Sequence, residues 1–246
     1  MSSRVAYGSR QASRGDDAVA TKESEKMMGT SDLETAYQSW MLAAQALDNA
    51  AEETAVTAAR RCLNTSGKVG WAWLEASLKD PRRCGFAAEV VSALTLPRRL
   101  FEPFLMAAVH EKNPSANRFL IEPCVKAAGA SRVLERLLVY LQSGSAAEKA
   151  GAASALYWVR TKEGECAELL RRIHGQMLDT FIAADDVDVR RRILPMLRLR
   201  ESLHTPEAAK ANEVIRIARS HSDDYLRHRV EVQLGNAATF SPLPDA

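Results

Sequence analysis

Four side chains close together near the end of the chain are of the types that bind metal ions: His221, Asp223, Asp224 and His228. Imidazole and carboxylate groups are common ligands of zinc and iron. Aspartate is also favoured immediately before a helix, where its carboxylate accepts hydrogen bonds from free backbone N–H groups. We predict that Asp223 or Asp224 caps a final helix, and that the chain has no metal site and no cofactor.

The sequence contains none of the short motifs that support nucleophilic or phosphate chemistry. It has no Gly-x-Ser-x-Gly segment, no glycine-rich phosphate loop and no Cys-x-x-Cys pair. The four cysteines, at positions 62, 84, 124 and 166, are widely spaced, which favours free thiols in a reducing compartment over a disulfide framework. We assign no catalytic residue. The lack of such motifs favours a binding protein over an enzyme. The free thiols lead us to expect the protein in the cytoplasm.

Basic side chains recur on segments that we expect to be the second helices of successive helical pairs. They are Arg98, Arg99, Arg132, Arg136, Arg171 and Arg172, followed by Lys210, Arg216 and Arg219. A row of this kind can bind an acidic partner or follow phosphates. The same segments also carry many carboxylates, and the net charge of the chain is only +2. Mixed-charge, solvated helix faces and an anion-binding groove are therefore both compatible with the sequence.

Trp73 is the aromatic candidate for partner binding. Trp71 and Trp73 are two positions apart, so they point about 200° apart around a helix. Trp71 aligns with Leu74 and Leu78 as a core stripe. Trp73 then either packs against the adjacent helical pair or faces a partner. Trp158 follows the small residues Gly151, Ser154 and Ala155, which favours a packing role.

The helices that position these residues are marked by their starts. Asp80, Asn113 and Thr205 each precede a proline, and a capping side chain followed by proline at the first helical position is typical of a helix start. Further candidate caps are Ser145, either Asp185 or Asp186, and either Ser222 or Asp223. Scarce glycine, β-branched and aromatic residues, with abundant alanine, leucine, arginine and glutamate, predict an all-α protein.

The polar ends of the chain are expected to lie outside the folded domain. Residues 1–29 hold few apolar residues, so we predict a disordered polar tail, with the first helix beginning at the Ser31–Glu34 capping box. Residues 237–246 are predicted to be a frayed end. The folded domain is placed at 30–236. No stretch of about 18 apolar residues occurs, so no membrane partner is expected.

A register repeats along the folded region. Basic residues at 83, 118, 149, 190 and 227 are each followed three positions later by an apolar residue: Phe86, Ile121, Ala152, Ile193 and Val230. A second apolar residue follows at the seventh position: Val90, Val125, Leu156, Leu197 and Leu234. These offsets place both on one helix face. The recurring base is expected to pair with a carboxylate of the neighbouring repeat.

This register resembles HEAT-like repeats, most clearly at Asp186-Val187-Asp188-Val189-Arg190 and Asp223-Asp224-Tyr225-Leu226-Arg227. The resemblance implies an α-α superhelix of about five to six helical hairpins. In that scheme the first helices lie at 50–63, 82–95, 115–128, 146–160, 187–200 and 224–235. The second helices, on the concave side, lie at 68–79, 98–112, 131–143, 164–184 and 206–221. A helix at 32–48 precedes them.

The repeat architecture and the lack of catalytic motifs favour a non-catalytic protein-interaction module, such as a scaffold, adaptor or regulator, that binds a protein partner on its concave surface. The alternative comes from the bacterial alkylpurine DNA glycosylases, which have a similar size, HEAT-like helical pairs and a basic concave face. The near-neutral charge does not favour DNA. Iron hydroxylases with HEAT-like repeats use several His-Glu pairs, whereas this chain has one, at 110 and 111.

Overall fold

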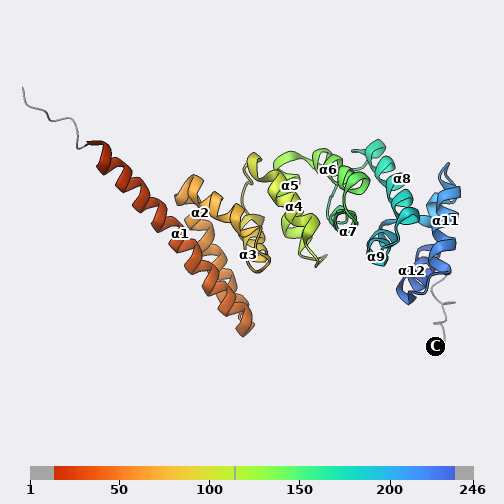
Figure 1. Cartoon of the computed structure of the whole chain (residues 1–246), viewed down its shortest axis with the longest axis horizontal. Helices are drawn as coiled ribbons and strands as arrows, with labels where there is room; N and C mark the ends of the chain where they lie inside the picture. Colours follow the sequence, from red (N-terminus) through yellow and green to blue (C-terminus); the bar gives the residue numbers. More distant parts are fainter. Residues whose placement is uncertain (1–13, 114, 236–246) are drawn as a thin grey trace, which may run out of the picture. The chain divides into compact units, whose positions relative to one another are not determined.

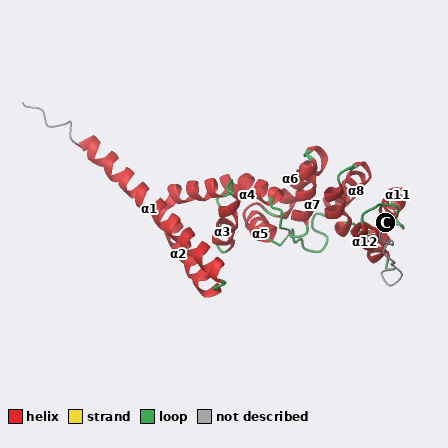
Figure 2. Ribbon diagram, turned by 60° about the horizontal axis from the view of Figure 1, so that its bottom comes forward, coloured by secondary structure: helices red, strands yellow, loops and turns green. Residues whose placement is uncertain are grey.

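The computed structural model describes residues 14–113 and 115–235, and for 14–29 it describes the backbone alone. Helices joined by turns and loops make up this part of the chain, which contains no β-strand (Figures 1 and 2). The predicted all-α class is confirmed. The chain divides into two compact units, Met1–Val90 and Val91–Ala246, where the sequence suggested a single domain over 30–236. We call them the N-terminal unit and the C-terminal unit.

Helix α1 (Arg14–Ala46) packs along helix α2 (Asn49–Ser77) as a hairpin (Figure 1). The predicted helix start at Ser31 is wrong, because α1 begins at Arg14 and includes residues 14–29 of the predicted disordered tail. This segment is rich in Ala, Lys, Glu and Met, which favour helix even without an apolar face. Residues 1–13 and the predicted frayed end at 237–246 lie outside the described residues.

A kink at Gly67 divides α2 into the two helices that the sequence predicts at 50–63 and 68–79. Gly67 has φ 53° and ψ −128°, a backbone conformation that a residue with a Cβ atom rarely adopts. The kink therefore depends on glycine at this position, and it turns the direction of the chain before Trp71 and Trp73.

The core of the N-terminal unit contains an aromatic cluster around Phe86 of α3 (Pro81–Ser92). The Phe86 ring is fully buried. Its centroid lies 5.7 Å from that of Tyr37, 5.5 Å from that of Trp40 and 6.3 Å from that of Trp73. Three helices therefore meet on one ring, at distances typical of favourable aromatic pairs.

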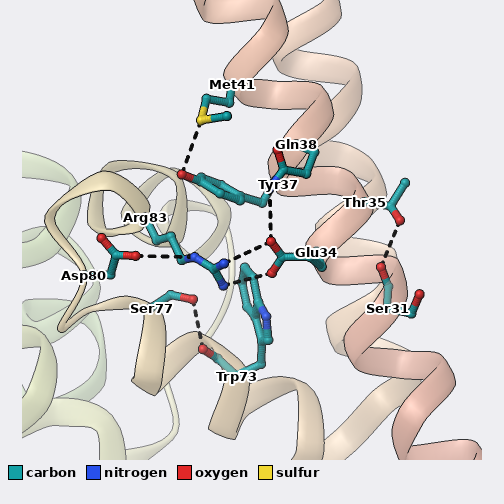
Figure 3. A network of polar contacts seen from close by, with 10 residues as sticks. All are labelled: Ser31, Glu34, Thr35, Tyr37, Gln38, Met41, Trp73, Ser77, Asp80 and Arg83. Atoms are coloured by element: carbon teal, nitrogen blue, oxygen red, sulfur yellow. Dashed lines mark hydrogen bonds and ion pairs between the residues drawn. The ribbon is translucent and has the colours of Figure 1, made fainter.

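Arg83 joins the same helices by polar contacts (Figure 3). Its two terminal nitrogens donate to the two carboxylate oxygens of Glu34 at 2.8 and 2.9 Å. The guanidinium carbon lies 5.0 Å from the ring centroid of Tyr37 and 5.7 Å from that of Trp73. Arg83 thus combines a bidentate ion pair between α1 and α3 with contacts to two aromatic rings.

The C-terminal unit is a succession of short helices (Figures 1 and 2). They are η1 (Arg98–Leu100), α4 (Phe101–His110), α5 (Asn117–Ala128), α6 (Ala130–Ser143), α7 (Ala146–Leu156), α8 (Ala167–Ala183), α9 (Val187–Ile193), η2 (Leu194–Met196), α10 (Leu199–Ser202), α11 (Ala208–Arg219) and α12 (Asp224–Leu234). The predicted segment 187–200 is divided among α9, η2 and α10.

Most of the predicted caps are present. Ser145 and Glu148 form a capping box at the start of α7, and the carboxylates of Asp186 and Asp223 accept backbone N–H groups at the starts of α9 and α12. Asp80 accepts from the N–H of Arg82 as α3 begins at Pro81. The other two predicted starts differ, because Asn113 and Thr205 form turns two or more residues before α5 and α11 begin.

The helices of the C-terminal unit pack in two series. We call α5, α7, α9 and α12 the first row, since each contacts the next. We call α4, α6, α8 and α11 the second row: α6 contacts α8 and α8 contacts α11, while an ion pair joins α4 to α6. The rows also contact each other, for example α4 with α5 and α6 with α7. A helix in the middle of a row therefore packs against the helices before and after it in its own row and against a helix of the other row.

Small residues let the rows approach closely where α7 crosses α4. Every residue from Ala150 to Leu156 is buried. A Cβ atom added to Gly151 would lie 1.6 Å from the carbonyl oxygen of Val109, far inside van der Waals contact. This agrees with the packing role predicted for the small-residue face of this segment, and it makes Gly151 a position where only glycine fits.

The repeated register agrees with the observed burial. The residue three positions after each recurring base is fully buried in all five copies. Of the residues at the seventh position, Val90, Leu156 and Leu197 are buried, and Val125 and Leu234 are half-buried. The predicted inward stripe is therefore confirmed in all five copies at the third position after the base. At the seventh position it is confirmed in three of the five copies.

The recurring bases themselves do not share one role. Arg83 pairs with another helix, as predicted. Arg118 and Arg227 pair instead with carboxylates of their own helices, Glu122 and Asp224. Arg190 donates to the backbone carbonyl of Phe181 at 3.3 Å.

Candidate partner-binding site

The structure places the predicted basic residues on the second row and on η1, which precedes it, and carboxylates accompany most of them. Arg98 and Arg99 lie exposed in η1, and Arg172 lies exposed on α8. Arg136 binds Glu102 of α4 at 3.0 Å, Arg132 lies 3.8 Å from Glu135, and Arg171 binds Glu168 at 2.7 Å. Lys210, Arg216 and Arg219 are likewise paired, with Asp179, Glu213 and Glu231. This pattern matches the mixed-charge interpretation better than the anion-binding groove.

Trp73 lies with the aromatic cluster of the N-terminal unit. Its ring is half-buried and meets Phe86 edge to face, with an interplanar angle of 89°. The contact with Phe86 is a packing contact of the kind that the sequence allows for Trp73. A contact between Trp73 and a partner stays a prediction.

A different part of the molecule, on the first row, forms a cavity of about 640 Å³. We call it the aromatic cavity. It is lined by Ser115, Ser154, Tyr157, Trp158, Asp188, Arg191, Arg192, Pro195, Met196 and Tyr225. Tyr157 is 57% exposed and Tyr225 is 45% exposed. Large aromatic rings that remain accessible to solvent are candidates for contact with a partner.

The aromatic wall of this cavity is held by ring and cation contacts. Tyr157 and Trp158 meet edge to face, with centroids 5.0 Å apart. The guanidinium carbon of Arg118 lies 5.9 Å from the Trp158 ring centroid, and that of Arg160 lies 6.0 Å from the Tyr157 ring centroid. These contacts restrict the two rings, so a partner can bind them with little further loss of side-chain freedom.

Two arginines form the polar wall. Arg192 donates to the hydroxyl of Ser154 at 3.0 Å and to the backbone carbonyl of Lys112 at 3.1 Å, and its Nε lies 3.5 Å from Asp188. Arg191 forms a hydrogen-bonded ion pair with Asp223. That hydrogen bond raises the pKa of Arg191 and lowers the pKa of Asp223. Both cations are thus fixed in place and largely balanced in charge.

This cavity has almost no signature in the local sequence. Local sequence favours a packing role for Trp158, and no motif marks Tyr157, Tyr225 or Arg191 as site residues. The run Tyr157-Trp158-Val159-Arg160 is the one local signal, since it combines two aromatic residues with a base. The other walls come from segments as far apart as Ser115 and Tyr225, which only the packing of the first row brings together.

A second cavity, of about 530 Å³, holds a serine–histidine contact. Nε2 of His174 lies 2.8 Å from Oγ of Ser202 and 3.8 Å from Glu207. In a catalytic triad the carboxylate binds the other ring nitrogen, Nδ1, and thereby orients the base. Here both partners face the same nitrogen, and the Ser202 hydroxyl donates to the carbonyl of Arg198 at 2.8 Å. Burial lowers the pKa of His174. The arrangement is that of a structural hydrogen bond.

The candidate metal ligands near the C-terminal end are used in other ways. Nδ1 of His221 accepts the backbone N–H of Asp223, Asp223 caps α12 and binds Arg191, and Asp224 pairs with Arg227. In the part of the chain that the structure describes, no three His, Cys, Asp or Glu side chains are grouped so as to hold a metal ion. The four cysteines are free thiols, and burial raises the pKa of Cys124 to about 12.

No family model, no curated protein and no solved structure matches this chain. The resemblance to HEAT-like repeats therefore rests on the sequence register alone. Among the described helices, none has both the length and the apolar character needed to cross a membrane.

Asp223 offers a test of how the polar wall is positioned. Replacing Asp223 with alanine removes the cap of α12 and the partner of Arg191, so we expect a loss of about 1–2 kcal/mol in unfolding free energy at neutral pH. Asp223→Asn retains a capping oxygen and should lose less. The measurement is urea unfolding of both variants and the wild-type chain.

The pH dependence of the same variants has a defined sign. The pKa of Asp223 is lowered in the folded chain, first by the hydrogen bond from Arg191. Its ionised form therefore stabilises the fold above its ordinary pKa of 3.8, and this contribution is lost as the pH falls through the lowered value. The stability difference between wild type and Asp223→Asn should shrink in that acidic range. A difference that stayed constant would contradict the role given to the ion pair.

Proposed function

We propose that this protein is a non-catalytic interaction module, built as a HEAT-like α-solenoid, that binds a protein partner. The two packed rows of helices and the recurring buried residues support the solenoid arrangement. Stacked helical pairs present extended surfaces, and such surfaces commonly bind other proteins. The serine–histidine contact lacks the geometry of a nucleophilic site, which agrees with a role in binding.

The observation that carries the proposal is the composition of the aromatic cavity. Tyrosine, tryptophan, methionine and arginine are enriched at the centres of protein interfaces, where a few such residues supply most of the binding energy. The cavity combines all four types, with Tyr157 and Tyr225 exposed at its surface. We therefore place the partner on the first row, and no longer on the second-row arginines and Trp73.

The charge arrangement also bears on the DNA glycosylase alternative. Proteins that follow a phosphate backbone use cations that are free to displace counterions. On the second row, Arg132, Arg136 and Arg171 each lie beside a carboxylate. This favours a protein partner, and DNA binding becomes an outcome for the experiment to detect.

The test is capture of partners from the native lysate by the immobilised full chain, after nuclease treatment. Replacing Tyr157 and Tyr225 together with alanine should reduce capture of the main protein at least tenfold. The matched control reverses charge at two second-row residues, Arg171→Glu with Arg172→Glu, and should capture normally. All four side chains are exposed, so both variants should fold normally. Their melting temperatures check this.

Two results would contradict the proposal. One is capture that survives the tyrosine variant and fails with the arginine variant, which would return the site to the second row. The other is salt-sensitive binding of labelled duplex DNA by the wild-type chain. In that case release of alkylated bases is the next assay.

A further inference from the structure

The end of the aromatic cavity lies close to the point where the chain leaves its last helix. Gln233, near the end of α12, donates from Nε2 to the backbone carbonyl of Pro195 at 3.2 Å, and Pro195 lines the cavity. Helix α12 ends at Leu234, and Gly235 follows with φ 81°, the left-handed conformation that ends many helices. The described part of the chain, which ends at Gly235, therefore ends close to the cavity.

The segment of residues 236–246 is long enough to reach the aromatic wall. It has eleven residues, and an extended chain spans at most about 3.3–3.6 Å per residue. Tyr225, on the first turn of α12, lines the cavity at the opposite end of this helix. Because α12 rises only about 1.5 Å per residue, a segment of this length can run back along it.

The chemistry of the segment complements that of the cavity. Its sequence, Asn-Ala-Ala-Thr-Phe-Ser-Pro-Leu-Pro-Asp-Ala, contains one aromatic residue, two prolines and one carboxylate. Segments with prolines favour the extended polyproline conformation, which docks in grooves lined by tryptophan and tyrosine at little entropic cost. Phe240 supplies an apolar anchor.

We infer that residues 236–246 occupy the aromatic cavity of their own molecule when no partner is bound. The segment is a built-in competitor that a partner must displace. A tethered segment of this length has an effective concentration in the millimolar range, so even weak contacts keep the cavity occupied. This inference rests on the proposed function in one respect, because both take the aromatic cavity to be a binding site.

The first experiment places a photoreactive group on the segment in the full chain. With p-benzoylphenylalanine in place of Phe240, irradiation should cross-link the segment within one molecule to Met196, Tyr157 or Tyr225, as mapped by mass spectrometry. The control carries the same probe together with Tyr157→Ala and Tyr225→Ala, and its yield at Met196 should fall at least fivefold. Cross-links elsewhere in the chain, or only between two molecules, would overturn the inference.

The second experiment measures competition. A labelled peptide of residues 236–246 should bind the full chain that carries Phe240→Ser and Leu243→Ser at least tenfold more tightly than it binds the wild-type chain, because the variant segment no longer fills the cavity. Equal binding to both chains, or none to either, would overturn the inference. Neither experiment contains a partner, so their failure leaves the capture assay, and with it the proposed function, to be judged separately.

Discussion

Replacing Gly151 with alanine is expected to destabilise the C-terminal unit by roughly 3 kcal/mol or more, at the upper end of what overpacking a core costs. The added Cβ would lie 1.6 Å from the carbonyl oxygen of Val109 and 2.7 Å from its carbonyl carbon. Both atoms belong to the backbone of α4, so no side chain can rotate out of the way. Helices α4 and α7 would have to separate along their whole contact.

Gly85→Ala is the matched control for this prediction. A Cβ at Gly85 would come no closer than 3.9 Å to Trp40, an ordinary contact, and Gly85 lies inside α3. Alanine is favoured over glycine in a helix interior by about 0.5–1 kcal/mol, so the control should be neutral or stabilising. Urea unfolding monitored by circular dichroism measures both. A harmless Gly151→Ala would show that α4 and α7 do not approach as described.

Replacing Phe86 with alanine should reduce the stability of the N-terminal unit by about 3–5 kcal/mol. The ring is fully buried and meets Tyr37, Trp40 and Trp73. Its loss leaves a void between three helices and removes the aromatic surface that each ring packs on. Tryptophan fluorescence during unfolding is a direct measure, because three of the four tryptophans, at 40, 71 and 73, lie in this unit.

Phe119→Ala provides the comparison. Phe119 lies on α5 and is 40% exposed, so its removal should change the stability by less than about 1 kcal/mol, as is usual for partly exposed positions. Similar losses for the two variants would mean that Phe86 is not the centre of the cluster. A loss at Phe86 with none at Phe119 supports the packing of α1, α2 and α3 around one ring.

The ion pairs of Arg136 and Arg83 could not be predicted from the sequence. The sequence pattern marks both as recurring basic residues, Arg136 as a partner-binding candidate and Arg83 as a structural base. In the structure Arg136 joins α6 to α4 through Glu102, which is 34 positions away, and Arg83 joins α3 to α1 through Glu34, which is 49 positions away. A helix pattern reports which face a side chain occupies. It does not report which carboxylate from another helix will meet it.

The start of α1 differs from the sequence prediction for a related reason. The Ser31–Glu34 sequence can form a capping box, but Glu34 binds Arg83 and the backbone carbonyl of Ser31 accepts from the hydroxyl of Thr35 within a continuing helix. Because helix propensity alone favours extension through Ala, Lys and Glu, no helix start is needed at that point. The same motif at Ser145 does begin a helix.

Local sequence was enough to predict the all-helical class, most helix positions, the capping box at Ser145, and the buried register through Phe86, Ile121 and Val230. At the starts of α9 and α12 it left neighbouring residues open as caps, and the structure selects Asp186 and Asp223. The predicted features depend on residues within about one turn of each other, through backbone hydrogen bonding and helical periodicity. The tertiary structure was needed to show that Trp73 packs on Phe86 and that Arg132, Arg136 and Arg171 lie beside carboxylates. It alone assembled the aromatic cavity, because the walls come from segments up to 110 positions apart, and long-range packing leaves no local pattern in the chain.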